Sequence, residues 1–118
     1  MIWKFRGFDA VGQKGWVYGD LVHNIKITAD KDIPRVMVGG YEVFGESVGL
    51  FTGLKDFNNI DIYEGDIIRI EKSKLYLVEF SEASFNLIRL FKFPLCIFES
   101  QKMEVIGNMF QNKELLQL

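Results

Sequence analysis

The sequence predicts a mainly β protein: a small meander of short antiparallel strands, with an SH3-like or bent-sheet barrel in its C-terminal half and little helix. Apolar segments and turn residues alternate at intervals of about ten residues along the chain. Glycines, 11 in 118 residues, crease the chain between these segments. The segments themselves are rich in β-branched and aromatic residues, as is typical of strands. An α+β fold is the alternative.

The first two segments predict a β-hairpin. Residues 2–8 alternate, imperfectly, between apolar and basic side chains, which is typical of a strand with one buried face. Lys4 and Arg6 share the basic face of this strand. Residues 9–15 supply turn residues, and residues 16–22 return as a second strand.

The next stretch is less regular. Residues 23–32 are compatible with a continued strand and with a loop, and both alternatives stay open. Over residues 33–46, Pro34 and the pair Gly39–Gly40 disfavour a long helix, so we expect short strands joined by glycine turns. Residues 47–55 then form another short strand.

The middle of the chain predicts a hairpin followed by a second bend. Residues 56–59 form the tight turn, because asparagine tolerates positive φ better than any residue except glycine. Ile60 and Ile62 share one face of the return strand. A bend at residues 64–66 leads into a strand over residues 67–72. Over residues 68–72 the pattern predicts that the outer side of this strand faces water.

The C-terminal part continues the meander. Residues 75–80 form a strand, residues 82–84 a polar break, and residues 85–93 the next extended segment. A last strand is expected over residues 103–109. In the tail, Asn112 is suited to cap a single helical turn.

The apolar run over residues 90–98 is unusual because both of its faces are apolar except at Lys92 and Pro94. Pro94 argues against a central strand. Burial within one domain and an intersubunit contact are the two interpretations. The only cysteine, Cys96, lies in this run and is expected to be a buried, reduced thiol. The residues expected at the contact are Leu90, Phe91, Phe93, Leu95 and Phe98.

The size and composition indicate a globular chain with a real core, since 48% of its 118 residues are apolar. We expect a single domain, or two lobes over residues 1–55 and 56–118, with any boundary between Gly45 and Tyr63. A formal net charge of −2 gives no global attraction to nucleic acid or anionic membranes. No apolar stretch reaches the ~20 residues of a membrane span, and the N-terminus lacks an export signal. A cytoplasmic location is therefore expected.

Three blocks of the sequence resemble the YopX family of phage and prophage proteins. They are residues 3–9 with 18–21, residues 48–56 with 62–68, and residues 104–108 with Asn112, Glu114 and Leu115. The chain departs from the family pattern where Asn59 replaces a usual glycine and where Lys113 replaces a frequent proline. The resemblance implies a β-rich, phage-encoded accessory protein that self-associates. It transfers no catalytic residue, because the family has no established biochemical activity.

No catalytic residue, metal site or cofactor is expected from the motifs. His23 is the only histidine, and no partner for a base or metal ligand stands at a motif spacing. The glycines follow neither a dinucleotide-binding nor a P-loop pattern. An acidic group invites a cation site or a carboxylate pair, although turn chemistry and solvated surface are the favoured interpretation. It comprises Glu42, Glu46, Asp56, Asp61, Glu64 and Asp66.

Two non-enzymatic functions remain. A self-associating protein-interaction module is preferred, as a homo-oligomer or with a host or phage protein as partner. The alternative is a small β-barrel that binds nucleic acid, with aromatics such as Tyr76 and Phe85 interleaved among its cations. Near the N-terminus, Lys4, Arg6, Lys14 and Lys26 also outnumber Asp9 and Asp20. The candidate nucleic-acid-binding residues are Arg69, Lys72, Lys74, Arg89 and Lys92.

Overall fold

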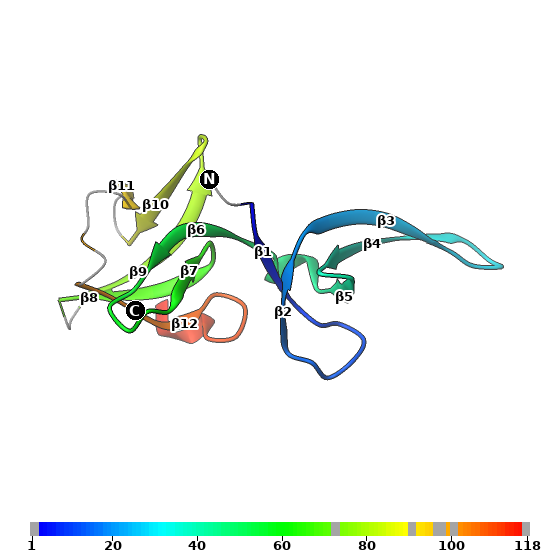
Figure 1. Cartoon of the computed structure of the whole chain (residues 1–118), viewed down its shortest axis with the longest axis horizontal. Coiled ribbons are helices and arrows are strands. Elements are labelled where there is room, and N and C mark those ends of the chain that lie inside the picture. The colour runs from blue at the N-terminus through cyan, green and yellow to red at the C-terminus, as the bar shows by residue number, and fades with distance from the viewer. Residues whose placement is uncertain (1–2, 72–73, 90–91, 96–98, 100–101, 117–118) are drawn as a thin grey trace. The chain divides into compact units, whose positions relative to one another are not determined.

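The structure is a computed structural model of the whole chain. It describes residues 3–71, 74–89, 92–95, 99 and 102–116. The chain is mainly β, as predicted, and its helical segments are short 3₁₀ turns (Figure 1). It divides between Leu50 and Phe51 into two compact units, which we call the N-terminal unit and the C-terminal unit.

The strands of the N-terminal unit build two small sheets. Their bounds are β1 (Phe5–Phe8), β2 (Trp16–Gly19), β3 (Leu21–Ile27), β4 (Asp32–Val38) and β5 (Tyr41–Val43), followed by the 3₁₀ turn η1 (Gly45–Ser47). The predicted hairpin at the start of the chain is confirmed, because β1 and β2 pair antiparallel. The strands β3, β4 and β5 form a three-stranded antiparallel sheet in that order. Short strands and a Gly39–Gly40 turn therefore occupy residues 33–46, as expected.

The core of the N-terminal unit is a small apolar cluster. Val17, Val38 and Val43 are buried together, and partly buried side chains from β1, β3 and β4 pack against them. A Cβ atom at Gly7 would lie 2.8 Å from the Val43 side chain, so glycine in β1 lets Val43 approach. Ser47 adds a polar tie, since its Oγ accepts the Phe8 N–H at 2.7 Å.

The basic face predicted for the first strand is wrong for Arg6. This side chain is 8% exposed, and its guanidinium carbon lies 4.5 Å from the centroid of the Trp16 ring. The β1–β2 pairing brings Trp16 onto the neighbouring strand, where its ring attracts the guanidinium by a cation–π interaction. Local alternation does not reveal this contact because it depends on the register of the hairpin.

The C-terminal unit contains the remaining strands. They are the second part of β6 (Gly49–Lys55), then β7 (Asp61–Tyr63), β8 (Asp66–Ile70), β9 (Lys74–Ser81), β10 (Ser84–Ile88), β11 (Lys92–Pro94) and β12 (Met103–Asn108), with a 3₁₀ turn η4 (Lys113–Leu116). The predicted meander is confirmed, because β8, β9, β10 and β11 pair in chain order. The last strand, β12, pairs with the edge of β8 that faces away from β9. Of these strands, β8 to β12 form an open, five-stranded sheet rather than a closed barrel, whereas β6 and β7 pair with each other outside it. The proline-containing strand β11 lies at an edge of this sheet, where a missing N–H is tolerated.

The core of the C-terminal unit lies on one face of this sheet. It consists of eight buried residues with Leu54, Phe85, Phe93 and Val105 packed against them. The buried members are Ile62, Ile68, Ile70, Tyr76, Val78, Leu87, Leu95 and Met103.

One predicted face in this region is wrong. Ile60 lies before β7 and is 51% exposed, whereas Ile62 is fully buried, so the two side chains do not share a burial environment. The water-facing side predicted for residues 68–72 is seen at Arg69, whose side chain is 42% exposed, and at the exposed Glu71, while the preceding Ile67 is fully buried. The predicted helical turn is present as η4, which packs against β9. The side chain of Asn112 does not act as the predicted N-cap, because its carboxamide oxygen accepts the N–H of the preceding Asn108.

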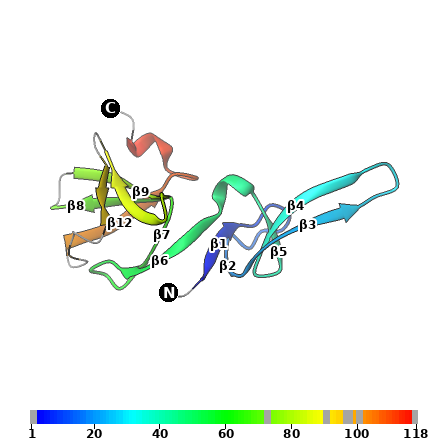
Figure 2. The same ribbon diagram turned by 90° about the horizontal axis from the view of Figure 1, so that it is seen from above.

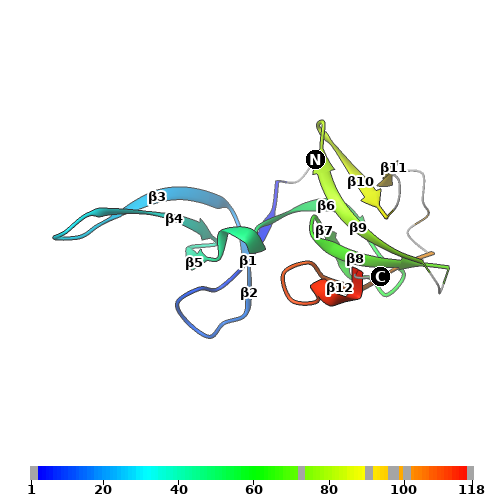
Figure 3. The ribbon, with the colours of Figure 1, turned by 180° about the vertical axis from the view of Figure 1, so that it is seen from behind.

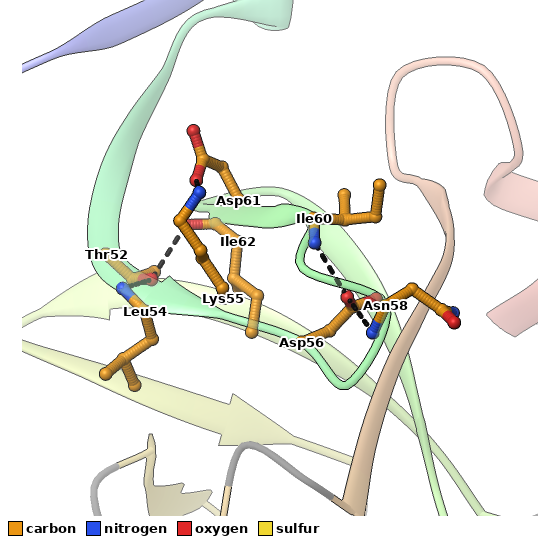
Figure 4. Close-up of polar contacts among 8 residues, drawn as sticks. All are labelled: Thr52, Leu54, Lys55, Asp56, Asn58, Ile60, Asp61 and Ile62. Atoms are coloured by element: carbon orange, nitrogen blue, oxygen red, sulfur yellow. Dashed lines mark hydrogen bonds and ion pairs between the residues drawn. The ribbon is translucent and has the colours of Figure 1, made fainter.

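The turn between β6 and β7 is organised by one buried carboxylate (Figure 4). Asp56 is 5% exposed, and its Oδ1 accepts the N–H groups of Asn58 and Ile60, both at 2.9 Å. Its Oδ2 accepts the N–H of Val105 in β12, also at 2.9 Å. Asn59 has a φ of 65°, as the tight asparagine turn requires. Asp56 thus closes its own hairpin and ties that hairpin to the last strand.

The bend between β7 and β8 also contains a buried aspartate that accepts a backbone N–H. Asp66 is 1% exposed, and its Oδ2 accepts the N–H of Tyr63 at 2.7 Å. Between them Gly65 has a φ of 92°, a conformation that other residues rarely adopt. The Tyr-Glu-Gly-Asp motif is therefore a turn that leads the chain into β8.

We predict that Asp56→Ala lowers the free energy of unfolding by about 3 kcal/mol, because the N–H groups of Asn58, Ile60 and Val105 lose their shared, buried acceptor. Asp61→Ala in the same hairpin is the matched control. Its carboxylate pairs with Lys55 at 3.1 Å, with the two side chains 28% and 53% exposed, so its loss costs at most about 1 kcal/mol. Urea unfolding of the full chain measures both variants. Equal losses would contradict the role given to Asp56.

Candidate interaction surface

A long hairpin in the N-terminal unit presents the candidate surface. We call β3, β4 and their turn, residues 21–38, the arm (Figure 1). Its strands pair from Leu21 opposite Val38 to Ile27 opposite Asp32. The neighbouring strand β5 pairs only with the last part of β4, so the outer half of the arm is a two-stranded ribbon (Figures 2 and 3). Of the two alternatives for residues 23–32, the strand extends to Ile27 and a turn follows it.

Local polar contacts shape the arm. At its tip the N–H of Thr28 donates to the carbonyl oxygen of Lys31 at 3.1 Å, and the N–H of Lys31 donates to the Thr28 hydroxyl. Halfway along, Nε of Arg35 donates to Oδ1 of Asn24 at 2.7 Å across the two strands. These contacts hold together a ribbon that apolar packing covers only at its base.

One face of the arm, which we call the apolar face, continues the core and carries Ile25 and Ile27, with His23 and Asp32 on the same side. Near the base, Val38 is fully buried and Leu21 packs against the same cluster. Every second residue of a strand points to the same side, so Ile25 and Ile27 extend this face outward. Their side chains are 59% and 81% exposed. The face that forms the core at the base is therefore left open along the outer half.

The two outer edges of the arm differ in their ability to accept another strand. The strand β3 ends its sheet, so no described strand pairs with its outer edge. The edge of β4 beyond β5 carries Pro34, which lacks an N–H and cannot complete a ladder. The edge of β3 contains no proline and is the one suited to strand addition.

The opposite face of the arm borders a groove of about 440 Å³. Its walls include Lys26 and Arg35 from the arm, Tyr41 and Glu42 from β5, and Lys14 from the loop after β1. Three cations and an aromatic ring from separate elements thus converge here.

Asp9 builds the loop that carries Lys14. Its carboxylate accepts the N–H groups of Val11 and Gly12, both at 3.1 Å, and of Lys14 at 3.3 Å. The backbone N–H groups of Gly12 and Val11, with smaller contributions from the N–H and charge of Lys14, lower the pKa of Asp9 below its ordinary value of 3.8. Asp9 is therefore committed to its loop and is not a free acceptor for a ligand.

The candidate nucleic-acid-binding residues do not form one patch among the described residues. Arg69 pairs with Glu104 at 2.6 Å across β8 and β12. Lys92 lies 4.0 Å from a carboxylate oxygen of Glu79. By strand register, Arg69 and Lys92 fall on the face opposite to that of Lys74. Arg89 is exposed in the bend after β10, and Lys72 lies outside the described residues.

Most of the residues predicted at an intersubunit contact are either outside the described residues or buried in the core. Leu90, Phe91 and Phe98 lie outside the described residues, as does Cys96. Leu95 is buried in the core of the C-terminal unit, so it has almost no surface to offer a partner. The half-buried Phe93 packs against the same core, with its ring 6.4 Å from that of Tyr76.

The remaining chemical candidates are dispersed. His23 is exposed on β3, opposite Val36. Of the acidic group, Asp56 and Asp66 serve turns, Asp61 pairs with Lys55, and Glu42 lies in the other unit. In the part of the chain that the structure describes, no three His, Cys, Asp or Glu side chains are grouped to hold a metal ion. No helix among those residues has the length and apolarity needed to cross a membrane.

Sequence reasoning missed the arm and the groove. The signal for the arm was present, because Leu21, Ile25 and Ile27 recur at even spacing, as in a strand with one apolar face. The groove had no local signal. Lys14, Lys26 and Arg35 come together only through the pairing of β3 with β4 and the folding of the preceding loop.

The chain is similar to known proteins over nearly its whole length. The profile of a family described as YopX protein matches residues 4–117. The crystal structure of protein EF1440 from Enterococcus faecalis is similar with a TM-score of 0.62 and 22% sequence identity. That match covers 99% of this chain and 99% of the other, and at this identity it shows the fold alone. No curated protein matches the sequence.

We predict that Asp9→Asn flattens the acid dependence of stability. Because the pKa of Asp9 is lowered in the folded chain, its stabilising effect is fully present above about pH 3.8 and is lost as the pH falls through the lowered value. The asparagine variant cannot lose a charge, so its urea midpoint should fall less between about pH 4 and about pH 2 than that of the unchanged chain. Asp30→Asn, at the exposed tip of the arm, controls for the loss of one negative charge. An unchanged slope in the Asp9 variant would contradict this account.

Proposed function

The chain belongs to the YopX family, and from this premise we propose that it is a non-catalytic, self-associating protein-interaction module whose copies join through the arm. The observation that carries the proposal is the open apolar face at Ile25 and Ile27 beside the free edge of β3. Fully burying an isoleucine side chain contributes about 1.5–3 kcal/mol. An exposed, apolar edge strand is a template for pairing with another chain.

A second copy of the chain suits this edge. Two β3 strands related by a twofold axis pair antiparallel, so the same patch serves both copies. With the axis at Asn24, Ile27 of one copy faces Leu21 of the other, and Ile25 faces His23. Lys26, the one formal charge on β3, then stands opposite Val22 rather than opposite itself. No like charges are therefore forced together.

The proposal includes a setting for this module. The resemblance supports a phage or prophage accessory protein, and a location in the host cytoplasm is part of the proposal. A host or phage protein that adds a strand to β3 would use the same edge. Self-association is preferred because the register above gives each copy a complementary surface without any further partner.

We predict that the unchanged chain is a dimer and that Ile25→Asp with Ile27→Asp makes it a monomer. The two carboxylates would place charge on the face that the partner must bury. Light scattering after size-exclusion chromatography measures the mass. Ile60→Asp is the matched control, because Ile60 is similarly exposed in the C-terminal unit and lies far from the arm in sequence. A monomeric unchanged chain, or a dimer that survives both arm substitutions, would overturn the proposal.

The register can be tested separately by cross-linking. In a Cys96→Ser background, Asn24→Cys should form an intermolecular disulfide, because Cβ atoms that face each other across paired strands lie about 4.5–5.5 Å apart. Ile27→Cys is the control. Three residues from the axis, its two copies stand roughly 20 Å apart at about 3.3 Å per residue and should not cross-link. The opposite pattern, seen on non-reducing gels, would exclude pairing centred on Asn24.

A further inference from the structure

The proposed self-association does not use the groove on the other face of the arm. We propose that it binds the phosphate group of a nucleotide, either free or within a single strand, with the nucleotide ring against Tyr41. Its walls come from three places in the N-terminal unit: the loop after β1, the arm, and the start of β5. A volume of about 440 Å³ is in the range of small-molecule sites.

The charges of the groove favour an anion. Lys14, Lys26 and Arg35 line it, and none of them has an ion-pair partner within 4.0 Å among the described residues. The carboxylate of Asp9 is already occupied by the N–H groups of its own loop. Glu42 is the other acidic lining residue, so cations are in excess. An anionic ligand would neutralise these cations and accept charge-assisted hydrogen bonds from them.

Arg35 is the fixed member of this set. The bond from its Nε to Asn24 holds the guanidinium against the arm at 2.7 Å. Its Nη groups have no described acceptor, so they remain available as donors to phosphate oxygens. The two lysines add flexible point charges that adjust around the same group.

Tyr41 gives the groove an aromatic wall. Its side chain is 39% exposed, and Nζ of Lys14 lies 5.4 Å from the ring centroid. A planar base can stack on such a ring while a nearby cation holds the phosphate, and this combination recurs in proteins that bind single strands. Neighbouring Gly40 carries no side chain that would cover the ring.

The groove and the apolar face lie on opposite sides of the arm. Lys26 and Arg35 belong to the set of alternate residues that points away from Ile25 and Ile27. The dimer-breaking substitutions at Ile25 and Ile27 should therefore leave anion binding intact. Anion binding in the monomeric variant keeps the fate of this inference separate from that of the proposed function.

The test is titration of the ¹⁵N-labelled full chain with inorganic phosphate, adenosine monophosphate and a short oligothymidylate. We expect saturable amide shifts in the loop after Asp9 and at Gly40–Glu42, with the two nucleotide ligands binding more tightly than phosphate. The double variant Lys14→Ala, Lys26→Ala should weaken binding at least tenfold. Lys102→Ala with Lys113→Ala is the control, since both side chains are exposed in the C-terminal unit and neither is a candidate nucleic-acid-binding residue.

The outcomes separate the two ligand sources. Saturation by the free nucleotide identifies a mononucleotide, whereas saturation by the oligonucleotide alone identifies a single strand. In the latter case, log K against log salt should have a slope of about −0.7, the value for neutralising one phosphate of a single strand, and the slope should be smaller in the double lysine variant. Binding that Lys14→Ala with Lys26→Ala leaves unchanged, or no saturable shift with any of the three anions, would overturn the inference.

Discussion

Buried aspartates that accept backbone N–H groups are the constraint on which both units depend. A carboxylate buried beside a core can satisfy the N–H groups of the turn that it closes. Asp9, Asp56 and Asp66 do this, and each is less than a tenth exposed. Asp56 has the widest reach, since it joins a hairpin to a strand that begins 47 residues later at Met103 through the N–H of Val105. Asp56 and Asp66, in the middle block of the family resemblance, are thus structural, and the candidate function lies on the surfaces between the turns.

The arm, unlike the turns, is not held by a buried carboxylate among the described contacts. Its base shares the apolar cluster of the N-terminal unit, but its outer half has only a partner strand and a few polar contacts. A lone two-stranded ribbon is marginally stable in water. A protein that keeps exposed isoleucines on such a ribbon gains stability when another chain covers them. The same ribbon carries cations on its other side, so one element can serve two ligands without competition between its faces.

The parts of the fold that could be predicted from the sequence are those set by local chemistry. The turn at Asn59, the bend at Gly65 and the edge position of Pro94 follow from backbone preferences that neighbouring residues do not change. The burial of Arg6 could not be predicted, because Trp16 reaches it only through strand register. The open sheet in place of a barrel is equally non-local, since closure depends on strand stagger. The groove was not predicted for the same reason, because its cations are distant in sequence and meet only in the folded unit.

Hydrogen exchange along β3 tests the central claim most directly. In an antiparallel strand, alternate N–H groups point toward opposite edges, so half of those between Val22 and Ile27 point away from β4. If copies join through this edge, the outward amides are protected at high protein concentration and exchange quickly on dilution, while the inward amides keep their protection. Outward amides that exchange at one fast rate at every concentration would contradict self-association through the arm.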